Sequence, residues 1–323
     1  MADLFPDSAN SFKSKLQGCI PQLAKNGVFI GTSSWKYPGW CGLIYDESRY
    51  VYRKKFAASR FERDCLAEYA EVFKTVCVDA AYYRFPDRRY LEGLVSQVPS
   101  DFLFGFKVTD EITLKQFPDL PRHGGRAGTP NANFLNADRF ATAFLQPCEE
   151  FRQRVGLLMF EFSHFSPADF ARGREFVAAL DQFLAKLPPG WPYGVEIRNA
   201  SFLHPDYFAV LARHQVAHVY NSWGDMPPVG EQMAMVGSLT HPRLCGARFL
   251  LKPGRKYQEA VDLFSPYDRV KEPNPAARAA GARLIKAGAV AGKEPRKTLI
   301  YVNNRLEGNA LATIQAMIEQ AQT

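Results

Sequence analysis

The chain has 323 residues, 46% of them hydrophobic and 23% charged, with a formal net charge of +7 and a pI near 9.0. No apolar run approaches the about 18 residues that a membrane span needs, and charged residues interrupt the first 27 positions, unlike the core of a signal peptide. We therefore expect a cytoplasmic globular protein with no membrane partner, whose basic charge favours an anionic one.

A short apolar run at residues 28–30 predicts the first buried strand, which ends at Gly31. The loop that follows carries Trp35, Tyr37 and Trp40 among small residues. We interpret this loop as a binding loop delivered by the end of a strand. The alternative is that its aromatic rings only cover the core or close the bottom of a barrel.

Apolar runs and amphipathic segments alternate along the rest of the chain. Strands are predicted at residues 28–30, 75–80, 102–108, 155–162, 193–197, 216–220, 244–251 and 298–302. Helices are predicted at residues 11–23, 59–73, 137–154 with a bend at Pro147, 167–187, 205–214, 275–287 and 309–320. One more helix is predicted to be capped by Asp87, and long loops follow the third strand, at 109–136, and the seventh.

About eight alternations of strand and helix predict an α/β fold, a single closed (β/α)8 barrel of the TIM type, with long loops after strands three and seven. An open doubly wound sheet is the main competitor, but the segment after the first strand lacks the glycines of a phosphate loop. We expect residues 1–27 to form an N-terminal extension with a short helix and residues 28–323 to form the barrel domain.

Enzymes with this fold place their site at the carboxyl-terminal ends of the strands, where almost every predicted strand here delivers a polar or ionisable side chain. The candidates for catalysis are Lys107, Glu161 and Glu196. The candidates for ligand binding are Trp35, Tyr37, Asp79, Tyr83, Arg84, Arg198, Asn221, Arg248, Asn303 and Asn304.

Glu161 and Glu196 end neighbouring predicted strands, and two carboxylates close together suit acid/base catalysis if their environments separate their pKa values. The alternative is a structural role. In that case Glu196 pairs with Lys107 or Arg248 and only neutralises the barrel mouth.

An anionic ligand is also favoured by the loops after strands seven and eight. Residues 252–256 are rich in Lys and Arg, and residues 303–308 lead into a helix whose free N–H groups would attract phosphate. The six histidines show no ligand pattern beyond His214 and His218, whose spacing straddles a predicted helix end, so we expect no metal site, and the sequence names no cofactor.

The ordered motifs resemble the YecE-like family, domain of unknown function 72. The matching segments are Gly31-Thr32-Ser33-Ser34-Trp35 with Tyr37, Trp40 and Gly42, Tyr82-Tyr83-Arg84-Phe85-Pro86, residues 104–107 with Ile112-Thr113, Val195-Glu196-Ile197-Arg198, and Tyr301-Val302-Asn303-Asn304 with Gly308. The resemblance implies a TIM barrel and no established activity. The chain departs from the family pattern at Cys77 and Asp79, at Glu161 and at Leu114, which suggests a divergent member.

Two functions are compatible with these observations. The first is an enzyme, a hydrolase or lyase, acting on an anionic ligand that is phosphorylated, sugar-containing or derived from nucleic acid. In it, Arg198 and Arg248 would stabilise charge together with Lys107. The alternative is a non-enzymatic protein that binds nucleic acid through its basic surface and exposed aromatic residues.

Overall fold

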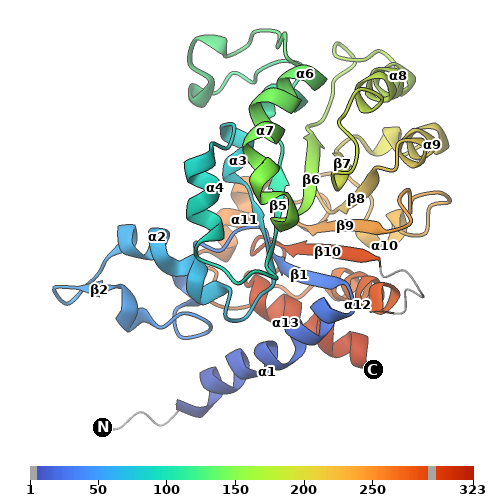
Figure 1. Cartoon of the computed structure of the whole chain (residues 1–323). Coiled ribbons are helices and arrows are strands. Elements are labelled where there is room, and N and C mark those ends of the chain that lie inside the picture. The colour runs from blue at the N-terminus through green and yellow to red at the C-terminus, as the bar shows by residue number, and fades with distance from the viewer. Residues whose placement is uncertain (1–5, 290–295) are drawn as a thin grey trace.

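The computed structural model describes residues 6–289 and 296–323, and eight of its strands are parallel and close into a barrel (Figure 1). Their order around the barrel is β1-β10-β9-β8-β7-β6-β5-β4, and β1 pairs with both β10 and β4. The strands are β1 (Val28–Thr32), β4 (Thr75–Val78), β5 (Leu103–Lys107), β6 (Val155–Phe162), β7 (Tyr193–Ile197), β8 (Ala217–Asn221), β9 (Leu244–Phe249) and β10 (Lys297–Val302). The predicted TIM-type barrel is confirmed.

Helices surround the barrel (Figure 1). The longer ones are α1 (Pro6–Lys25), α2 (Ala58–Tyr69), α4 (Arg88–Val95), α8 (Gly173–Leu184), α9 (Pro205–Arg213), α12 (Pro275–Ala289) and α13 (Ala310–Gln322). The predicted cap at Asp87 is present, since its Oδ1 accepts a hydrogen bond from the backbone N–H of Tyr90 at 2.8 Å. Residues 1–5 of the predicted N-terminal extension lie outside the described residues.

Two predicted helices were too long. The segment 137–154 is broken into α6 (Ala137–Phe140), a π-helical turn, α7 (Gln146–Cys148) and a 3-10 helix, because Pro147 has no N–H to continue the ladder. The predicted helix at 167–187 begins only at Gly173. Before it, Asp169 accepts hydrogen bonds from the N–H and the hydroxyl of Ser166, which makes a turn.

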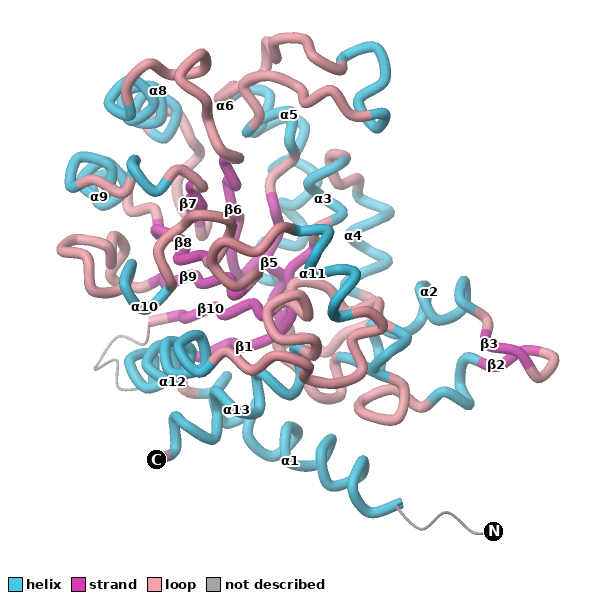
Figure 2. Tube along the Cα trace, turned by 180° about the vertical axis from the view of Figure 1, so that it is seen from behind, coloured by secondary structure: helices cyan, strands magenta, loops and turns pink. Residues whose placement is uncertain are grey.

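Short elements were missed because two to four residues carry too little periodicity to be recognised. They include β2 (Val51–Tyr52), β3 (Lys55–Phe56), α3 (Ala80–Tyr83), α5 (Asp110–Thr113) and α10 (Val229–Gln232), and the eight-residue helix α11 (Tyr257–Phe264) was also missed. α5 and a 3-10 helix at Pro121–Arg126 lie in the loop that was expected to be irregular. β2 and β3 form an antiparallel hairpin that projects from the body in both views (Figures 1 and 2).

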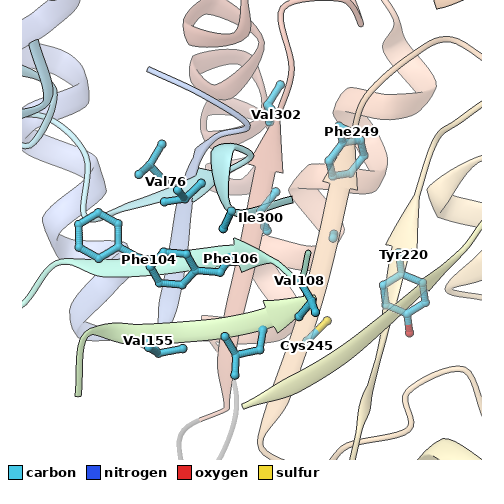
Figure 3. Close-up of a cluster of buried hydrophobic side chains, with 14 of the residues drawn as sticks. Val76, Phe104, Phe106, Val108, Val155, Tyr220, Cys245, Phe249, Ile300 and Val302 are labelled. Atoms are coloured by element: carbon cyan, nitrogen blue, oxygen red, sulfur yellow. The ribbon is translucent and has the colours of Figure 1, made fainter. Parts of the chain in front are cut away.

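Alternate residues of each barrel strand face opposite sides. The outward side chains pack under the helices, as Phe104, Phe106 and Val108 do after one another along one segment (Figure 3). The inward side chains form a separate buried cluster of Cys77, Leu157, Met159, Ala217, Val219, Leu244, Leu299 and Tyr301. The barrel interior is therefore a filled apolar core and not a channel.

Close packing in this interior depends on glycine at the narrowest points. A Cβ atom on Gly105 would lie 2.3 Å from the hydroxyl oxygen of Tyr301 and 2.6 Å from its Cζ. The Tyr301 side chain thus occupies the space that any other residue at position 105 would need, and its hydroxyl lies 3.2 Å from Thr75 Oγ1.

Two residues further toward the carboxyl ends of the strands, the inward side chains become polar. This change follows the two-residue period, from Cys77 to Asp79, from Gly105 to Lys107 and from Met159 to Glu161. The polar side chains of the barrel mouth thus lie directly above the apolar core of the barrel.

No helix in the described part of the chain has the length and apolar character to cross a membrane.

The glycine packing gives a first prediction. Gly105→Ala should lower the free energy of unfolding by about 1–3 kcal/mol in urea denaturation, because the new methyl group overpacks the Tyr301 site. The double variant Gly105→Ala, Tyr301→Leu should be more stable than the sum of the two single changes predicts. Gly93→Ala is the control, since a Cβ at that exposed position in α4 meets no atom within 4 Å. Equal effects of the two alanines would contradict the packing argument.

Candidate functional site at the barrel mouth

Six ionisable side chains meet at the carboxyl-terminal end of the barrel. They are Lys107, Arg198, Arg248, Asp79, Glu161 and Glu196. Glu161 is the centre of this group, because its Oε2 lies 2.7 Å from both Lys107 Nζ and Arg198 Nη2. Arg248 Nη1 donates to the same oxygen at 3.0 Å.

Glu196 extends the network on the next strand. Its Oε1 accepts a hydrogen bond from Arg198 Nε at 3.2 Å, and its Oε2 accepts one from Arg248 Nη1 at 2.8 Å. Asp79 joins through its Oδ1, which lies 3.4 Å from Arg248 Nη2. Three cations and three carboxylates are thereby connected, and their formal charges cancel. We call these six residues the mouth network.

The strand register explains why the carboxylates need these partners. Glu161 on β6 is paired directly with Glu196 on β7, and two adjacent carboxylates out of water repel each other. Arg248 comes from β9, two strands away from β7, and its Nη1 lies between the two carboxylates. One guanidinium thus bonds to both neighbours and offsets their repulsion.

The pKa of Glu161 lies well below its ordinary value. Burial alone would raise this pKa, but the cations Arg198, Lys107 and Arg248 outweigh burial. For Arg248, burial alone would lower the pKa, but Glu196 and the other acidic groups around it raise the pKa well above its ordinary value. Glu161 is therefore ionised at neutral pH and has no proton to donate there.

Lys107 and Arg198 form the outer side of the mouth network. Each side chain is 10% exposed, whereas that of Glu161 is 2% exposed. Lys107 Nζ lies 3.8 Å from the ring centre of Tyr82, and the Arg198 guanidinium lies 4.0 Å from the Trp223 ring. These cation–π contacts support two cations that are partly removed from water.

Asp79 is the most accessible carboxylate of the network, with 34% of its side chain exposed. It lies beside Lys107 across the barrel rim, because the residues that precede the two are register partners on β4 and β5. In the described part of the chain, its Oδ1 contacts Arg248 and the Cys77 thiol, and Oδ2 has no hydrogen-bond partner. One oxygen of Asp79 is thus available to a ligand.

The three predicted asparagines hold backbone around the mouth. Asn221 is fully buried and donates a hydrogen bond to the Ile197 carbonyl at 3.0 Å. Asn303 Oδ1 accepts a hydrogen bond from a backbone N–H in the turn after β10, and Asn304 Oδ1 accepts one from Ala310 N at 2.7 Å. Their predicted role in ligand binding stays a prediction.

The predicted aromatic loop is largely packed into the protein. Trp35 is 6% exposed and belongs to the main hydrophobic core, and Trp40 is fully buried. Tyr37 is half-buried between Trp40 and Tyr267, at ring distances of 4.8 and 5.5 Å, and burial raises its pKa to about 12. Trp35 and Trp40 therefore cover the core, which was the alternative interpretation of this loop.

Tyr83 and Arg84 lie on the outside, with Tyr83 59% exposed and the Arg84 guanidinium 3.4 Å from Asp87. The residue that contacts the mouth network is Tyr82, which sequence reasoning passed over in favour of Tyr83. α3 begins directly after β4, and successive side chains of a helix point about 100° apart. The two tyrosines that follow the apolar run of β4 indicated that an aromatic side chain lies near the site. Choosing between Tyr82 and Tyr83 required knowing that both are in a helix. Trp223 was also missed.

The expected phosphate site after β9 and β10 already has internal partners. Lys252 and Arg255 both bind Glu272, at 2.8 and 2.7 Å. The first N–H groups of α13 donate to Asn304 and Asn309. An anion at this position would therefore compete with partners that these donors already have.

A cavity of about 280 Å³ lies beside the mouth, between the loops after β5 and β6. Leu114, Ser163 and His164 line it together with residues 115–119, Gly128, Phe165 and Asp169. Ser163 and His164 come two and three residues after Glu161 in the sequence, so this wall of the cavity lies next to the mouth network. Among the described residues, no group of three or more His, Cys, Asp or Glu side chains could hold a metal ion.

A family model described as "Protein of unknown function DUF72" matches residues 29–323, which include every barrel strand except the first residue of β1. The chain belongs to the DUF72 family. The resemblance inferred from the ordered motifs is thereby confirmed.

Relatives of known sequence or structure agree with this assignment. UPF0759 protein YecE of Escherichia coli K12 is 27% identical over 182 residues, which are 56% of this chain and 50% of YecE. The chain thus spans about half the length of the curated relatives it matches. Crystal structures of DUF72 proteins from Enterococcus faecalis V583 and Thermotoga maritima MSB8 are similar, with TM-scores of 0.59 and 0.55 and identities of 18% and 17%. These alignments cover 92% and 91% of this chain and 96% and 98% of the neighbours, and they support the fold.

The central place of Glu161 gives a second prediction. Glu161→Gln should lower the free energy of unfolding by about 3–5 kcal/mol, because it leaves buried cations without a counter-charge. Glu272→Gln, which removes a surface carboxylate shared by two cations, should cost less than about 1 kcal/mol. Urea unfolding of the two variants measures the difference, and similar losses would contradict a buried, mutually dependent network.

The lowered pKa of Glu161 gives this prediction a pH dependence. The folded pKa lies below the unfolded value of 4.5, so the stabilisation is fully present above that value and is lost as the pH falls below it. The stability gap between wild type and Glu161→Gln should therefore be constant near neutral pH and should shrink below about pH 4.5. A gap that widens in acid would contradict the sign of this shift.

Proposed function

We propose that this DUF72 protein is an enzyme, a hydrolase or lyase, that acts on a small anionic ligand at the barrel mouth. The observation that carries the proposal is the layering of the mouth network. Its carboxylates Glu161 and Glu196 are buried, whereas Lys107 and Arg198 are each 10% exposed and Asp79 is 34% exposed. A ligand therefore meets two cations and one carboxylate.

The two cations suit an anionic group such as phosphate. Arg198 uses Nε and Nη2 for the glutamates, and its Nη1 has no hydrogen-bond partner among the described residues. Lys107 has three donors, of which one is directed at Glu161. Both side chains are held by carboxylate and aromatic contacts, so little side-chain entropy is lost when an anion binds.

Asp79 suits proton transfer. Its accessible oxygen lies on the same rim as Lys107, so it would accept a proton from a hydroxyl, an amine or a water molecule of the bound complex. Lys107 would then stabilise negative charge that develops on the ligand. A sugar phosphate has both required parts, an anionic group for the cations and hydroxyl groups for Asp79.

Glu161 and Glu196 fit positioning roles better than direct proton transfer. Both oxygens of Glu196 are engaged, and Glu161 shares one oxygen among three cations. Through these contacts, the two glutamates would fix the orientation in which Lys107 and Arg198 meet a ligand.

A thermal-shift screen tests the anion site, with inorganic phosphate, sugar phosphates and nucleotides as probes. At least one probe should raise the melting temperature of the wild type, because a ligand that binds only the native state stabilises it. Arg198→Ala should abolish this shift, and Arg198→Lys should reduce it, because a lysine lacks the planar group with which Arg198 contacts both glutamates and still offers Nη1 to an anion.

Arg174→Ala is the matched control, because Arg174 is an exposed cation on α8 outside the mouth network. It should leave the shift unchanged. Asp79→Asn should retain the shift but lose turnover of whichever probe is converted. A wild type that no anion stabilises, or a shift that survives Arg198→Ala, would overturn the proposal.

A second candidate function, binding of nucleic acid, is favoured by the β2–β3 hairpin. Its turn places Arg53 and Lys54 at φ values of 47° and 62°, a left-handed conformation that such residues rarely adopt. Tyr52 is 61% exposed beside them, with the Arg53 guanidinium 5.3 Å from its ring centre. A projecting two-stranded ribbon with cations and an aromatic ring at its tip suits phosphates and bases.

Fluorescence anisotropy with a labelled single-stranded oligonucleotide tests this second function. Affinity should fall steeply with salt, and the double variant Arg53→Gln, Lys54→Gln should weaken binding about tenfold through lost phosphate contacts. Arg198→Ala should bind like the wild type in this assay. Binding that depends on Arg198 and not on the hairpin would instead place the oligonucleotide at the barrel mouth.

A further inference from the structure

A further cation lies at the mouth end of the barrel, outside the mouth network. Arg305 follows β10 and is partly exposed, whereas residues 301–304 and 306–310 are buried. Its guanidinium lies 4.6 Å from the ring centre of Tyr257, but it makes no hydrogen bond and no ion pair with any described residue. Its Nε is buried without a partner there. Arg305 therefore lacks the carboxylate that every cation of the mouth network has.

The hydroxyl of Tyr37 lies near this cation. Burial raises the pKa of Tyr37 to about 12, while the charge of Arg305 lowers it and the charge of Asp79 raises it. Such effects fall off with distance, so both charged side chains are close to the hydroxyl. Tyr37 keeps its proton at neutral pH, and its hydroxyl has no hydrogen-bond partner among the described residues. It is therefore a donor available to a ligand.

Three neighbouring strands thus end near polar groups that lack partners. β10, β1 and β4 are consecutive around the barrel. They are followed by Arg305, Tyr37 and Asp79, and the Oδ2 of Asp79 is unpaired as well. The next three strands, β5, β6 and β7, lead to Lys107 and Arg198. The barrel mouth therefore has two sides, and each side presents a cation.

Aromatic rings connect the two sides. The Arg198 guanidinium lies 4.0 Å from the Trp223 ring, which lies 6.2 Å from the ring of Tyr257. The Tyr257 ring in turn lies 4.6 Å from the Arg305 guanidinium. Even laid end to end, these distances keep the two guanidinium groups within reach of one small molecule. Tyr257 is 48% exposed, so this aromatic wall borders solvent.

We propose that the substrate of the barrel mouth carries two anionic groups, one at each end. One end binds Lys107 and Arg198, as in the proposed function on which this inference rests. The other end, a phosphate or a carboxylate, binds the paired N–H donors of Arg305 and the hydroxyl of Tyr37. The free oxygen of Asp79 then meets the uncharged middle of the substrate.

Isothermal titration calorimetry with two pairs of probes tests the second position. 3-Phosphoglycerate and glycerol 3-phosphate differ only in a carboxylate against a hydroxymethyl group, and fructose 1,6-bisphosphate carries one phosphate more than fructose 6-phosphate. In at least one pair, the probe with two anionic groups should bind the wild type about tenfold more tightly, the effect of one charge-assisted hydrogen bond. A preference in the first pair identifies a carboxylate, and one in the second pair identifies a second phosphate.

Variants assign this preference to particular residues. Arg305→Gln should bind both members of the preferred pair about equally, and its melting temperature should match that of the wild type because Arg305 has no ion pair to lose. Tyr37→Phe, which removes only the hydroxyl, should reduce the preference. Arg174→Gln is the matched control on an exposed arginine of α8, and it should keep the preference.

Arg198→Ala separates this inference from the proposed function. It should weaken both members of a pair, because it removes the position that they share. If the wild type binds paired probes equally and Arg198→Ala weakens both, the proposed function stands and the second position is wrong. A preference that survives in Arg305→Gln would also overturn the second position. If no probe binds the wild type, both proposals fail.

Discussion

The charge balance of the mouth network is the constraint on which the upper half of the barrel depends. Glu161 and Glu196 are buried side by side, and removing such charges from water costs several kcal/mol each unless partners replace the lost hydration. Arg248 supplies that replacement from across the barrel. Any change to one member of the network therefore alters the positions and charges of the others.

This balance also limits how a ligand finds the site. A network whose formal charges cancel attracts little at long range, so Lys107 and Arg198 would act on an anion mainly at contact. Attraction from a distance would come from the net charge of +7 on the chain as a whole. The two effects are separable, because added salt screens the second far more than the first.

The sequence predicted the barrel well because each strand is a continuous apolar run, and β6 and β7 begin and end at the predicted residues. It also indicated which strand ends carry charge. It could not indicate burial, since an acidic residue at the end of a strand looks alike in the sequence whether it is buried, as Glu161 is, or accessible, as Asp79 is. Nor could it distinguish Tyr82 from Tyr83, because that depends on a single helical turn directly after β4.

The β2–β3 hairpin has a practical consequence for handling the protein. Its projecting turn presents Arg53, Lys54 and Lys55 in sequence, and proteases that cleave after basic residues act first at exposed tips of this kind. The hairpin belongs to a separate two-stranded sheet, so a cut there would leave every barrel strand paired. The same turn is accordingly the position at which a fluorescent label or an affinity tag would disturb the barrel least.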